Sequence, residues 1–265
     1  MCLILFAHHA HRDYPLVMAA NRDEAFARPA TPAAFWPDDP RIFAGRDLKQ
    51  GGTWLGVTRA GRLAAVTNYR DPTAPRTAPM SRGALVRDFL RGEVSAERYL
   101  QDVSARADQY NGFIVIAGDI GRLYWLSNRG PGVQAVAPGV HGLSNHLLDT
   151  PWPKIQRARQ TLSTLLGAAE PELRSRLFEV LADRTPAPDS DLPDTGVGLH
   201  RERELSSVFV TGDRYGTRAS TLLLVHRDGG VLFVERSYGP QGARLGEIEQ
   251  RFELDPLIAA ATALR

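Results

Sequence analysis

The chain has 265 residues, 43% hydrophobic and 23% charged, so it is long and apolar enough to bury a substantial core. Its formal net charge is +2 and its basic residues are scattered, which argues against a nucleic-acid or membrane-surface partner. A single cysteine excludes an intramolecular disulfide and a multi-cysteine zinc site, and no apolar run is long enough to span a membrane.

Arginine supplies all but two of the 32 basic residues, and alanine, glycine and proline are abundant. This composition predicts a bacterial source with a GC-rich genome. The apolar start at residues 3–7 lacks the basic segment of a secretory signal, and the lone cysteine fits a reducing compartment. We therefore expect a cytoplasmic protein with one domain over residues 1–265.

The first half of the chain alternates short apolar runs with turns. Runs at residues 2–7 and 16–20 flank a polar tip and predict a β-hairpin. A second strand pair is predicted at residues 53–58 and 63–67, around Ala60 and Gly61. Two helices follow, one over residues 85–90 and one over residues 99–107 after the capping residue Ser95.

The second half repeats this order of strands, helices and strands. Strands are predicted at residues 113–117, 123–127 and 133–137. Thr150 and Pro151 predict the start of a helix with a buried face at residues 155–165, and a second helix covers residues 173–181. After a proline-rich surface loop at residues 185–194, strands are predicted at residues 207–211, 220–226 and 231–237, with a C-terminal helix starting at Asp255 and Pro256.

Strands and helices that occur in separate runs favour stacked antiparallel sheets covered by helix layers, and argue against a doubly wound parallel sheet. The sequence therefore predicts an α+β fold, an αββα sandwich. It contains no phosphate-binding loop, no HExxH zinc helix and no GxSxG nucleophile elbow, which removes several enzyme classes.

Cys2 is the strongest candidate for chemistry because of its position. A small second residue permits removal of Met1, which would leave a thiol and a free α-amino group on one residue. The reference pKa is about 8 for an α-amine and about 8.5 for a thiol, so the amine can accept the thiol proton near neutral pH. The alternative is that Cys2 is a small apolar residue on a buried strand.

Other polar side chains at strand ends could complete a site. A hairpin would bring Asp23, at the end of the second strand, close to residue 2, where its carboxylate could hold the α-ammonium. Asn68 follows another strand and could donate to an oxyanion, and Asn145 offers a second amide. Taken singly, each asparagine is more often a turn former.

The run Asn21 to Glu24 is the signature of the NRDE family, also called the Transport and Golgi organisation protein 2 family, which this chain resembles. Family-like blocks occur in order at residues 1–2, 14–24, 52–70, 142–152, 192–197, 205–210 and 215–221. The resemblance implies the fold of the N-terminal-nucleophile (Ntn) hydrolases. It agrees with the αββα sandwich predicted from the order of elements.

The chain is also similar to the choloylglycine hydrolase branch of that superfamily. This likeness implies that Cys2 is the nucleophile, Asp23 the aspartate near the amine, Asn68 the oxyanion asparagine and Asn145 a later site asparagine. It implies hydrolysis or acyl transfer at a non-peptide carbon–nitrogen bond, with no cofactor required.

One position departs from that branch, which has an arginine three residues before the aspartate where this chain has Ala20. Arg22 is a candidate catalytic residue beside Asp23, but neighbouring strand side chains point to opposite faces, so we do not expect it to replace the missing arginine. Arg218 is the candidate substitute. It is predicted to bind substrate together with Trp54.

A non-catalytic function is the alternative, because the resembled family has been linked to haem trafficking and to lipid or acyl-CoA homeostasis. The chain would then be a carrier or chaperone for haem or such a lipid, or an inactive Ntn fold that contacts other proteins. Non-covalent haem ligands would come from Cys2, His8, His9 and His11, although histidines at a hairpin tip are more often solvated. The substrate, the oligomeric state and the presence of turnover are left open.

Overall fold

A computed structural model describes residues 2–74 and 78–255, and the predicted C-terminal helix lies outside this part from Pro256 onward. The chain starts with β1 (Cys2–His8), β2 (Leu16–Ala25), β3 (Ala30–Trp36), β4 (Asp39–Asp47), β5 (Leu55–Thr58) and β6 (Arg62–Asn68). It continues with α1 (Arg82–Arg91), α2 (Ala96–Ser104), β7 (Phe113–Asp119), β8 (Arg122–Ser127), β9 (Gln134–Ala135) and β10 (Gly139–Leu143). The last elements are α3 (Pro153–Thr164), α4 (Glu170–Leu181), α5 (Leu199–Glu204), β11 (Tyr215–Val225), β12 (Gly230–Tyr238) and β13 (Arg244–Glu253).

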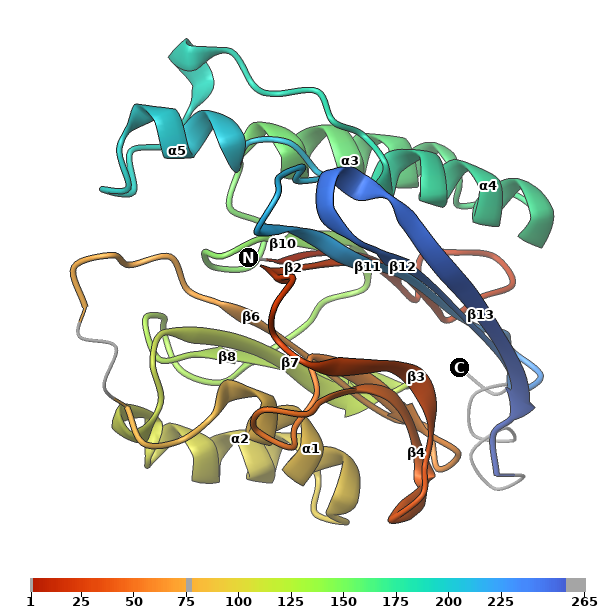
Figure 1. The fold of residues 1–265 in the computed structure, drawn as a ribbon. Helices are drawn as coiled ribbons and strands as arrows, with labels where there is room; N and C mark the ends of the chain where they lie inside the picture. The colour runs from red at the N-terminus through yellow and green to blue at the C-terminus, as the bar shows by residue number, and fades with distance from the viewer. Residues whose placement is uncertain (1, 75–77, 256–265) are drawn as a thin grey trace.

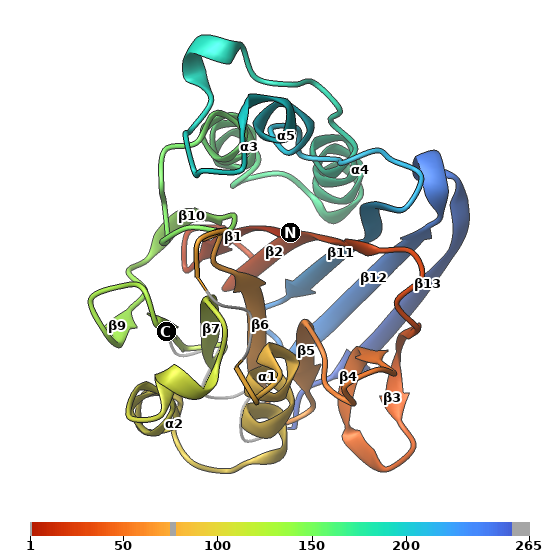
Figure 2. The same cartoon turned by 60° about the vertical axis from the view of Figure 1, so that its left-hand side comes forward.

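The strands form two antiparallel sheets that lie face to face between two layers of helices (Figures 1 and 2). The six-stranded sheet has the order β10-β1-β2-β11-β12-β13 and is covered by α3, α4 and α5. The seven-stranded sheet has the order β3-β4-β5-β6-β7-β8-β9 and is covered by α1 and α2. The predicted αββα sandwich is confirmed.

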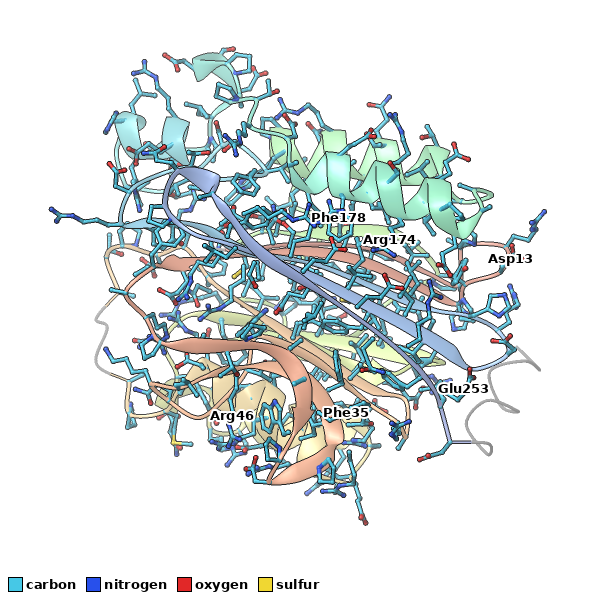
Figure 3. All side chains as sticks on the ribbon, turned by 45° about the vertical axis from the view of Figure 1, so that its right-hand side comes forward. Asp13, Phe35, Arg46, Arg174, Phe178 and Glu253 are labelled. Carbon is cyan, nitrogen blue, oxygen red and sulfur yellow. The ribbon has the colours of Figure 1, made fainter. Side chains whose placement is uncertain are left out.

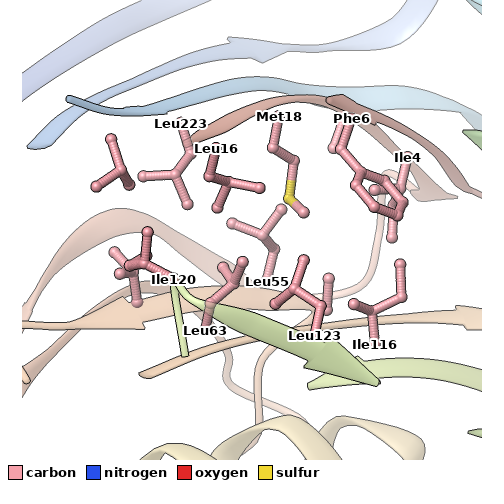
Figure 4. Close-up of a cluster of buried hydrophobic side chains, with 14 of the residues drawn as sticks. Ile4, Phe6, Leu16, Met18, Leu55, Leu63, Ile116, Ile120, Leu123 and Leu223 are labelled. Atoms are coloured by element: carbon pink, nitrogen blue, oxygen red, sulfur yellow. The ribbon is translucent and has the colours of Figure 1, made fainter. Parts of the chain in front are cut away.

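Three apolar clusters fill the spaces between these four layers. The central cluster joins the facing sides of the two sheets and contains Ile4, Phe6 and Met18 (Figure 4). A second cluster lies between the six-stranded sheet and α3 and α4, and a third lies between the seven-stranded sheet and α1 and α2. Because side chains alternate along a strand, β1 contributes Ile4 and Phe6 to the central cluster and Leu3 and Leu5 to the helix side.

Local capping explains where the helices begin. The Ser95 hydroxyl accepts a hydrogen bond from the backbone N–H of Arg98 at 3.3 Å and so caps α2, as predicted. The helix predicted from Thr150 and Pro151 begins instead at Pro153. Trp152 is its extended cap residue, and proline at the first helical position loses no helical hydrogen bond.

Several other sequence predictions need correction. The strand predicted at residues 207–211 does not form, although Val208 to Val210 are buried. The backbone N–H of Phe209 donates to the Asp183 carbonyl, and that of Val210 donates to the Thr217 hydroxyl. These bonds hold the segment in place without the regular hydrogen-bond ladder of a β-sheet. Strands β3, β4, β10 and β13 and helix α5 were not predicted, and only Gln134–Ala135 of the strand predicted at residues 133–137 is extended.

Ion pairs connect the exposed side of β13 to the helix layer. Arg174 of α4 lies at 2.6 Å from Glu249 and at 3.2 Å from Glu247, and Figure 3 shows Arg174 beside β13. Arg236 of β12 also pairs with Glu247, at 2.6 Å. Within the described ranges, no helix is long and apolar enough to span a bilayer.

Candidate active site

The site lies where β1 begins and where β2 and β6 end, so the sandwich brings Cys2, Asp23 and Asn68 to one edge of the molecule. A cleft of about 290 Å³ opens there, and most of the side chains that line it are polar or charged. Its walls include Cys2, Arg22, Asp23, Glu24, Arg28, Asp47, Gln50, Thr53, Trp54, Asn68, Ser81, Arg82 and Asn111. The predicted nucleophile therefore borders the same cavity as four of the six other predicted site residues.

Cys2 is half-buried and pairs directly with Arg22 in the antiparallel register of β1 and β2. Burial is the largest cause that raises the pKa of its thiol above the ordinary value. The backbone N–H of Asp23 hydrogen-bonds to the sulfur, and the positive charge of Arg22 also opposes this rise. A thiol in this setting needs a nearby base or cation to become a thiolate.

Asp23 is 4% exposed, and the alternation of side chains along β2 places it on the helix side of the six-stranded sheet with Val17 and Ala19. Its Oδ1 accepts a hydrogen bond of 2.7 Å from the hydroxyl of Thr217, the residue opposite it on β11. Burial raises the pKa of the Asp23 carboxyl, whereas the charge of the N-terminal amino group, the Lys154 ammonium and the Thr217 hydroxyl oppose this rise, in that order. The backbone carbonyl of Asp23 accepts a bond from the Tyr215 hydroxyl at 3.1 Å.

Arg22 occupies a position that the sequence argument did not expect. Residues 20 and 22 of one strand share a face, so Arg22 lies on the same side of the sheet as Ala20 and directly opposite Cys2. The face of the strand therefore does not separate Arg22 from position 20, and the expectation that Arg22 does not replace an arginine there stays a prediction. Its guanidinium lies 4.2 Å from the ring centre of Trp54 and 3.6 Å from the Asp47 carboxylate.

Trp54 depends on a glycine for its place in the cleft wall. A Cβ atom added at Gly45 would lie 2.2 Å from Cη2 of the Trp54 ring, well inside van der Waals contact. We expect Gly45→Ala to displace the ring from Arg22 and to cost about 1–3 kcal/mol of unfolding free energy, measured by urea denaturation. Gly246→Ala is the control, because no atom lies within 4 Å of its added Cβ. Equal stability of the two variants would contradict this account of Trp54.

The two asparagines have different places in the site. Asn145 is fully buried with a φ of 58°, and its side-chain amide donates to the backbone carbonyl of Asn68 at 2.9 Å. The Asn145 carbonyl also accepts a hydrogen bond of 2.8 Å from the Arg70 backbone N–H. Asn145 therefore orients the end of β6, whereas the Asn68 side chain itself lines the cleft.

A second cavity of about 380 Å³ adjoins the first, and five residues line both: Glu24, Arg28, Asn68, Arg82 and Asn111. Its other walls include Tyr69, Arg70, Asn145, Arg201 and Tyr215. The two cavities meet at Asn68, so a ligand larger than one cavity could pass the predicted oxyanion residue. Charged and polar groups predominate in both.

Arg218 is not brought to the Cys2 cleft. It lies at a bulge in β11, between residues 217 and 219, and its guanidinium donates to the backbone carbonyls of Ala25 and Arg28. These bonds brace the connection between β2 and β3. Arg218 lines a neighbouring cavity that shares only Arg22 and Trp54 with the Cys2 cleft.

Lys154 is a site neighbour that the sequence argument missed. It is 3% exposed, and its ammonium donates to the Leu205 carbonyl at 2.9 Å. Burial lowers the pKa of Lys154 to about 8, and the charge of Asp23 opposes that fall. One signal was available, because Lys154 is one of two lysines in an arginine-rich chain and stands at a helix start between Trp152 and Ile155.

The candidate haem ligands are not gathered at one place. Cys2 and His8 stand at opposite ends of β1, six residues apart, which on a strand is about 20 Å. His11 is buried and its Nδ1 accepts the backbone N–H groups of Asp13 and Tyr14, so the ring shapes the hairpin tip. Among the described residues, no group of three or more His, Cys, Asp or Glu side chains could hold a metal ion.

Two solved structures are similar to the chain over most of their length. The Caenorhabditis elegans ortholog of N-acylethanolamine-hydrolyzing acid amidase is 12% identical, with a TM-score of 0.47, over 84% of this chain and 92% of that one. The C2A mutant of the conjugated bile acid hydrolase from Clostridium perfringens is 8% identical, with a TM-score of 0.49, over 97% and 98%.

Curated relatives match more closely in sequence. Transport and Golgi organization protein 2 homologs from Bos taurus and Homo sapiens are 38% and 37% identical, over 89% of this chain and 93% of each relative. Transport and Golgi organization protein 2 of Drosophila melanogaster is 28% identical, over 89% and 92%. These relatives are eukaryotic and contradict the bacterial source predicted from composition.

The resemblance seen in the sequence motifs extends over most of the chain. A family model described as Transport and Golgi organisation 2 matches residues 1–240. Those residues include the Asn21 to Glu24 signature and every predicted site residue. With relatives above 30% identity across nine-tenths of its length, the chain belongs to the Transport and Golgi organisation 2 family.

Proposed function

We propose that the protein is an N-terminal-nucleophile hydrolase or acyl-transfer enzyme that uses Cys2 to act on a non-peptide amide bond. The observation that carries the proposal is that the Cys2 thiol borders a polar cleft together with Asp23 and Asn68. Nucleophile, carboxylate and amide donor are the three groups that an amine-assisted acyl transfer needs. A small polar amide fits the charged walls of the cleft.

The proposed reaction starts after removal of Met1, when the α-amino group of Cys2 takes the thiol proton. The sulfur attacks the amide carbonyl carbon, and the carbon–nitrogen bond breaks as the α-ammonium returns that proton to the leaving nitrogen. An amine leaves and an acyl thioester remains. The α-amine then deprotonates water, which attacks the thioester carbon and releases a carboxylic acid and the thiol.

Each neighbouring residue has a part in this proposal. Asn68 donates its side-chain N–H to the oxyanion, and Asn145 orients Asn68 through its carbonyl. Asp23 stabilises the α-ammonium, and Arg22, opposite Cys2, stabilises negative charge on sulfur. Trp54 forms the cleft wall against which substrate packs. No role at the reacting atoms is proposed for Arg218.

A trapping experiment tests the proposal directly. Incubation of Met1-processed protein with p-nitrophenyl acetate is expected to give a stoichiometric burst of p-nitrophenolate and one added acetyl group in the intact mass, mapped to Cys2. Protein that retains Met1 should show neither, because its α-amine is not on the nucleophile. Acetylation that is absent from Cys2, or that is equal with and without Met1, would overturn the proposal.

A haem or lipid carrier remains the alternative. A haem function stays a prediction, and the distance between Cys2 and His8 means that both could not ligate one haem iron. The cytoplasmic location also stays a prediction. The charged cleft walls favour a polar substrate over an apolar ligand.

A further inference from the structure

Tyr69 directly follows Asn68 at the end of β6 and lines the second cavity, yet the proposed reaction assigns it no part. The peptide group that joins the two residues is hydrogen-bonded at both ends. Its N–H, that of Tyr69, donates to the Gly112 carbonyl at 2.9 Å, and its carbonyl accepts the Asn145 amide at 2.9 Å. The Tyr69 side chain therefore starts from a fixed point beside the predicted oxyanion residue.

The Tyr69 hydroxyl begins a chain of three short hydrogen bonds. Its oxygen lies 2.8 Å from Nε2 of His146, and Nδ1 of His146 lies 2.8 Å from Oγ1 of Thr150. The same Thr150 oxygen lies 2.8 Å from the Leu147 carbonyl. Of the side chains in this hydrogen-bonded chain, all of them described, Tyr69 is the one that lines the second cavity.

The positions of the protons along this chain follow from counting donors and acceptors. A carbonyl has no proton to give, so the single hydroxyl proton of Thr150 lies on the bond to Leu147. Thr150 therefore accepts from His146, which requires a proton on Nδ1. Burial, and then the charge of Arg70, lower the pKa of His146 below its ordinary value, so the ring is neutral at pH 7 and Nε2 has a lone pair. The Tyr69 hydroxyl must donate to that lone pair.

This arrangement decides what Tyr69 can offer to a ligand. A phenol has one proton, and the proton of Tyr69 is directed to His146, so the oxygen has only lone pairs left. Burial raises the pKa of Tyr69 above its ordinary value, so the phenol is not ionised at pH 7. A group that binds to this oxygen in the second cavity must therefore be a hydrogen-bond donor.

The charge of the cavity walls limits the kind of donor. The charged residues that line the second cavity are Arg28, Arg70, Arg82, Arg201, Glu24 and Asp71. Even with Arg70 balanced by its ion-pair partner Glu202, the arginines outnumber the carboxylates. An ammonium group is disfavoured in such surroundings. A neutral N–H or O–H group fits them better.

We propose that Tyr69 is a specificity-determining residue that accepts a hydrogen bond from a neutral N–H or O–H group of the substrate, and that His146 keeps it an acceptor. The inference rests on the proposed function and narrows its substrate class to amides with a second, neutral hydrogen-bond donor. His146 is a positioning residue that acts through Tyr69 and is assigned no contact with substrate.

Matched acylating probes test this preference on Met1-processed protein. S-acetyl-N-acetylcysteamine has an amide N–H on the leaving side, and p-nitrophenyl N-acetyl-β-alaninate has one on the acyl side. Each is compared with the analogue in which CH₂ replaces that N–H. The rate constant for acylation of Cys2, followed by intact mass, should be about 2- to 10-fold higher for the N–H member of at least one pair, as expected for one neutral hydrogen bond. Equal rates within both pairs overturn the inference.

Two variants assign the preference to its residues. Tyr69→Phe keeps the ring and removes the acceptor, so the ratio of the two rates should fall close to unity. His146→Phe should also lower the ratio, because the freed hydroxyl proton of Tyr69 can turn toward the ligand. Tyr124→Phe is the matched control, since its hydroxyl donates to Glu97 at 3.3 Å and it is a described residue outside the walls of both cavities. A wild-type ratio in either of the first two variants overturns the inference.

The hydrogen-bonded chain also has a readout that needs no turnover. With nitrogen-15-labelled histidine at pH 7, the ring signals of His146, identified as those that His146→Phe removes, should show a protonated Nδ1 and an unprotonated Nε2. A proton on Nε2 overturns the inference even if Cys2 reacts. Failure of p-nitrophenyl acetate, which has no such donor, to acylate Cys2 would overturn the proposed function instead, and the ring signals would still decide the state of Tyr69.

Discussion

Cys2→Ala is expected to abolish turnover of p-nitrophenyl acetate, with a loss of about 10⁴-fold or more, since removal of a covalent nucleophile leaves only binding and oxyanion stabilisation. Fold and stability should be nearly unchanged. Cys2 is half-buried at the first position of β1, and the substitution removes one sulfur atom beside an open cleft. We expect a change of about 1 kcal/mol or less in the free energy of unfolding.

Steady-state kinetics and urea denaturation on the same preparations separate chemistry from folding. Cys2→Ser is the matched control, because it also permits removal of Met1 and keeps an oxygen nucleophile beside the α-amine. It should retain slow acylation, whereas Cys2→Ala should retain none. Turnover by Cys2→Ala at the wild-type rate would show that another group performs the reaction.

Glu202→Ala is expected to destabilise the protein by about 3–5 kcal/mol, because it leaves the Arg70 guanidinium buried without its carboxylate. Burial already lowers the pKa of Arg70, and the charge of Glu202 is the largest influence that opposes this. Glu202 also accepts hydrogen bonds from the backbone N–H and the hydroxyl of Thr195. The loss would be a large share of the stability of a typical domain.

An exposed ion pair on the same helix gives the comparison. Arg203 pairs with Asp189 where both side chains are about half exposed, so Asp189→Ala should cost about 1 kcal/mol or less. The double change Arg70→Met with Glu202→Met removes both buried charges and should recover much of the lost stability. If Glu202→Ala and Asp189→Ala have equal denaturation midpoints, this account of Arg70 is wrong.

Burial determines which elements could be predicted from the sequence. Strands β1, β2, β6 and β7 and helices α1 to α4 bury a regular set of side chains, and their apolar spacing predicts them. Strands β3 and β13 lie at sheet edges. Most of β13 is exposed and only two residues of β3 are buried, so their sequences carry little apolar alternation. Pro32 in β3 reads as a strand breaker but is tolerated at an edge.

Part of the candidate site could also be predicted from the sequence. Hairpin geometry was enough to predict that Asp23 lies near residue 2, because the β1 and β2 register is set by a short tip. The sequence argument compared the Arg22 side chain with that of residue 23, whereas residue 20 is the position that decides which face of β2 Arg22 shares. Lys154 was missed because a charged residue at a helix start normally faces solvent, whereas here it is buried and donates to the Leu205 carbonyl just after α5, a contact distant in the sequence.

Strand β13 also bears on how copies of this protein behave when concentrated. In the described part of the chain it is the outermost strand of its sheet, and such a strand offers backbone groups that can recruit another chain. Its sequence places charges at Arg244, Glu247, Glu249, Arg251 and Glu253. A strand docking there would remove water from these groups and break their ion pairs, so the charges of β13 oppose aggregation at this edge of the sheet.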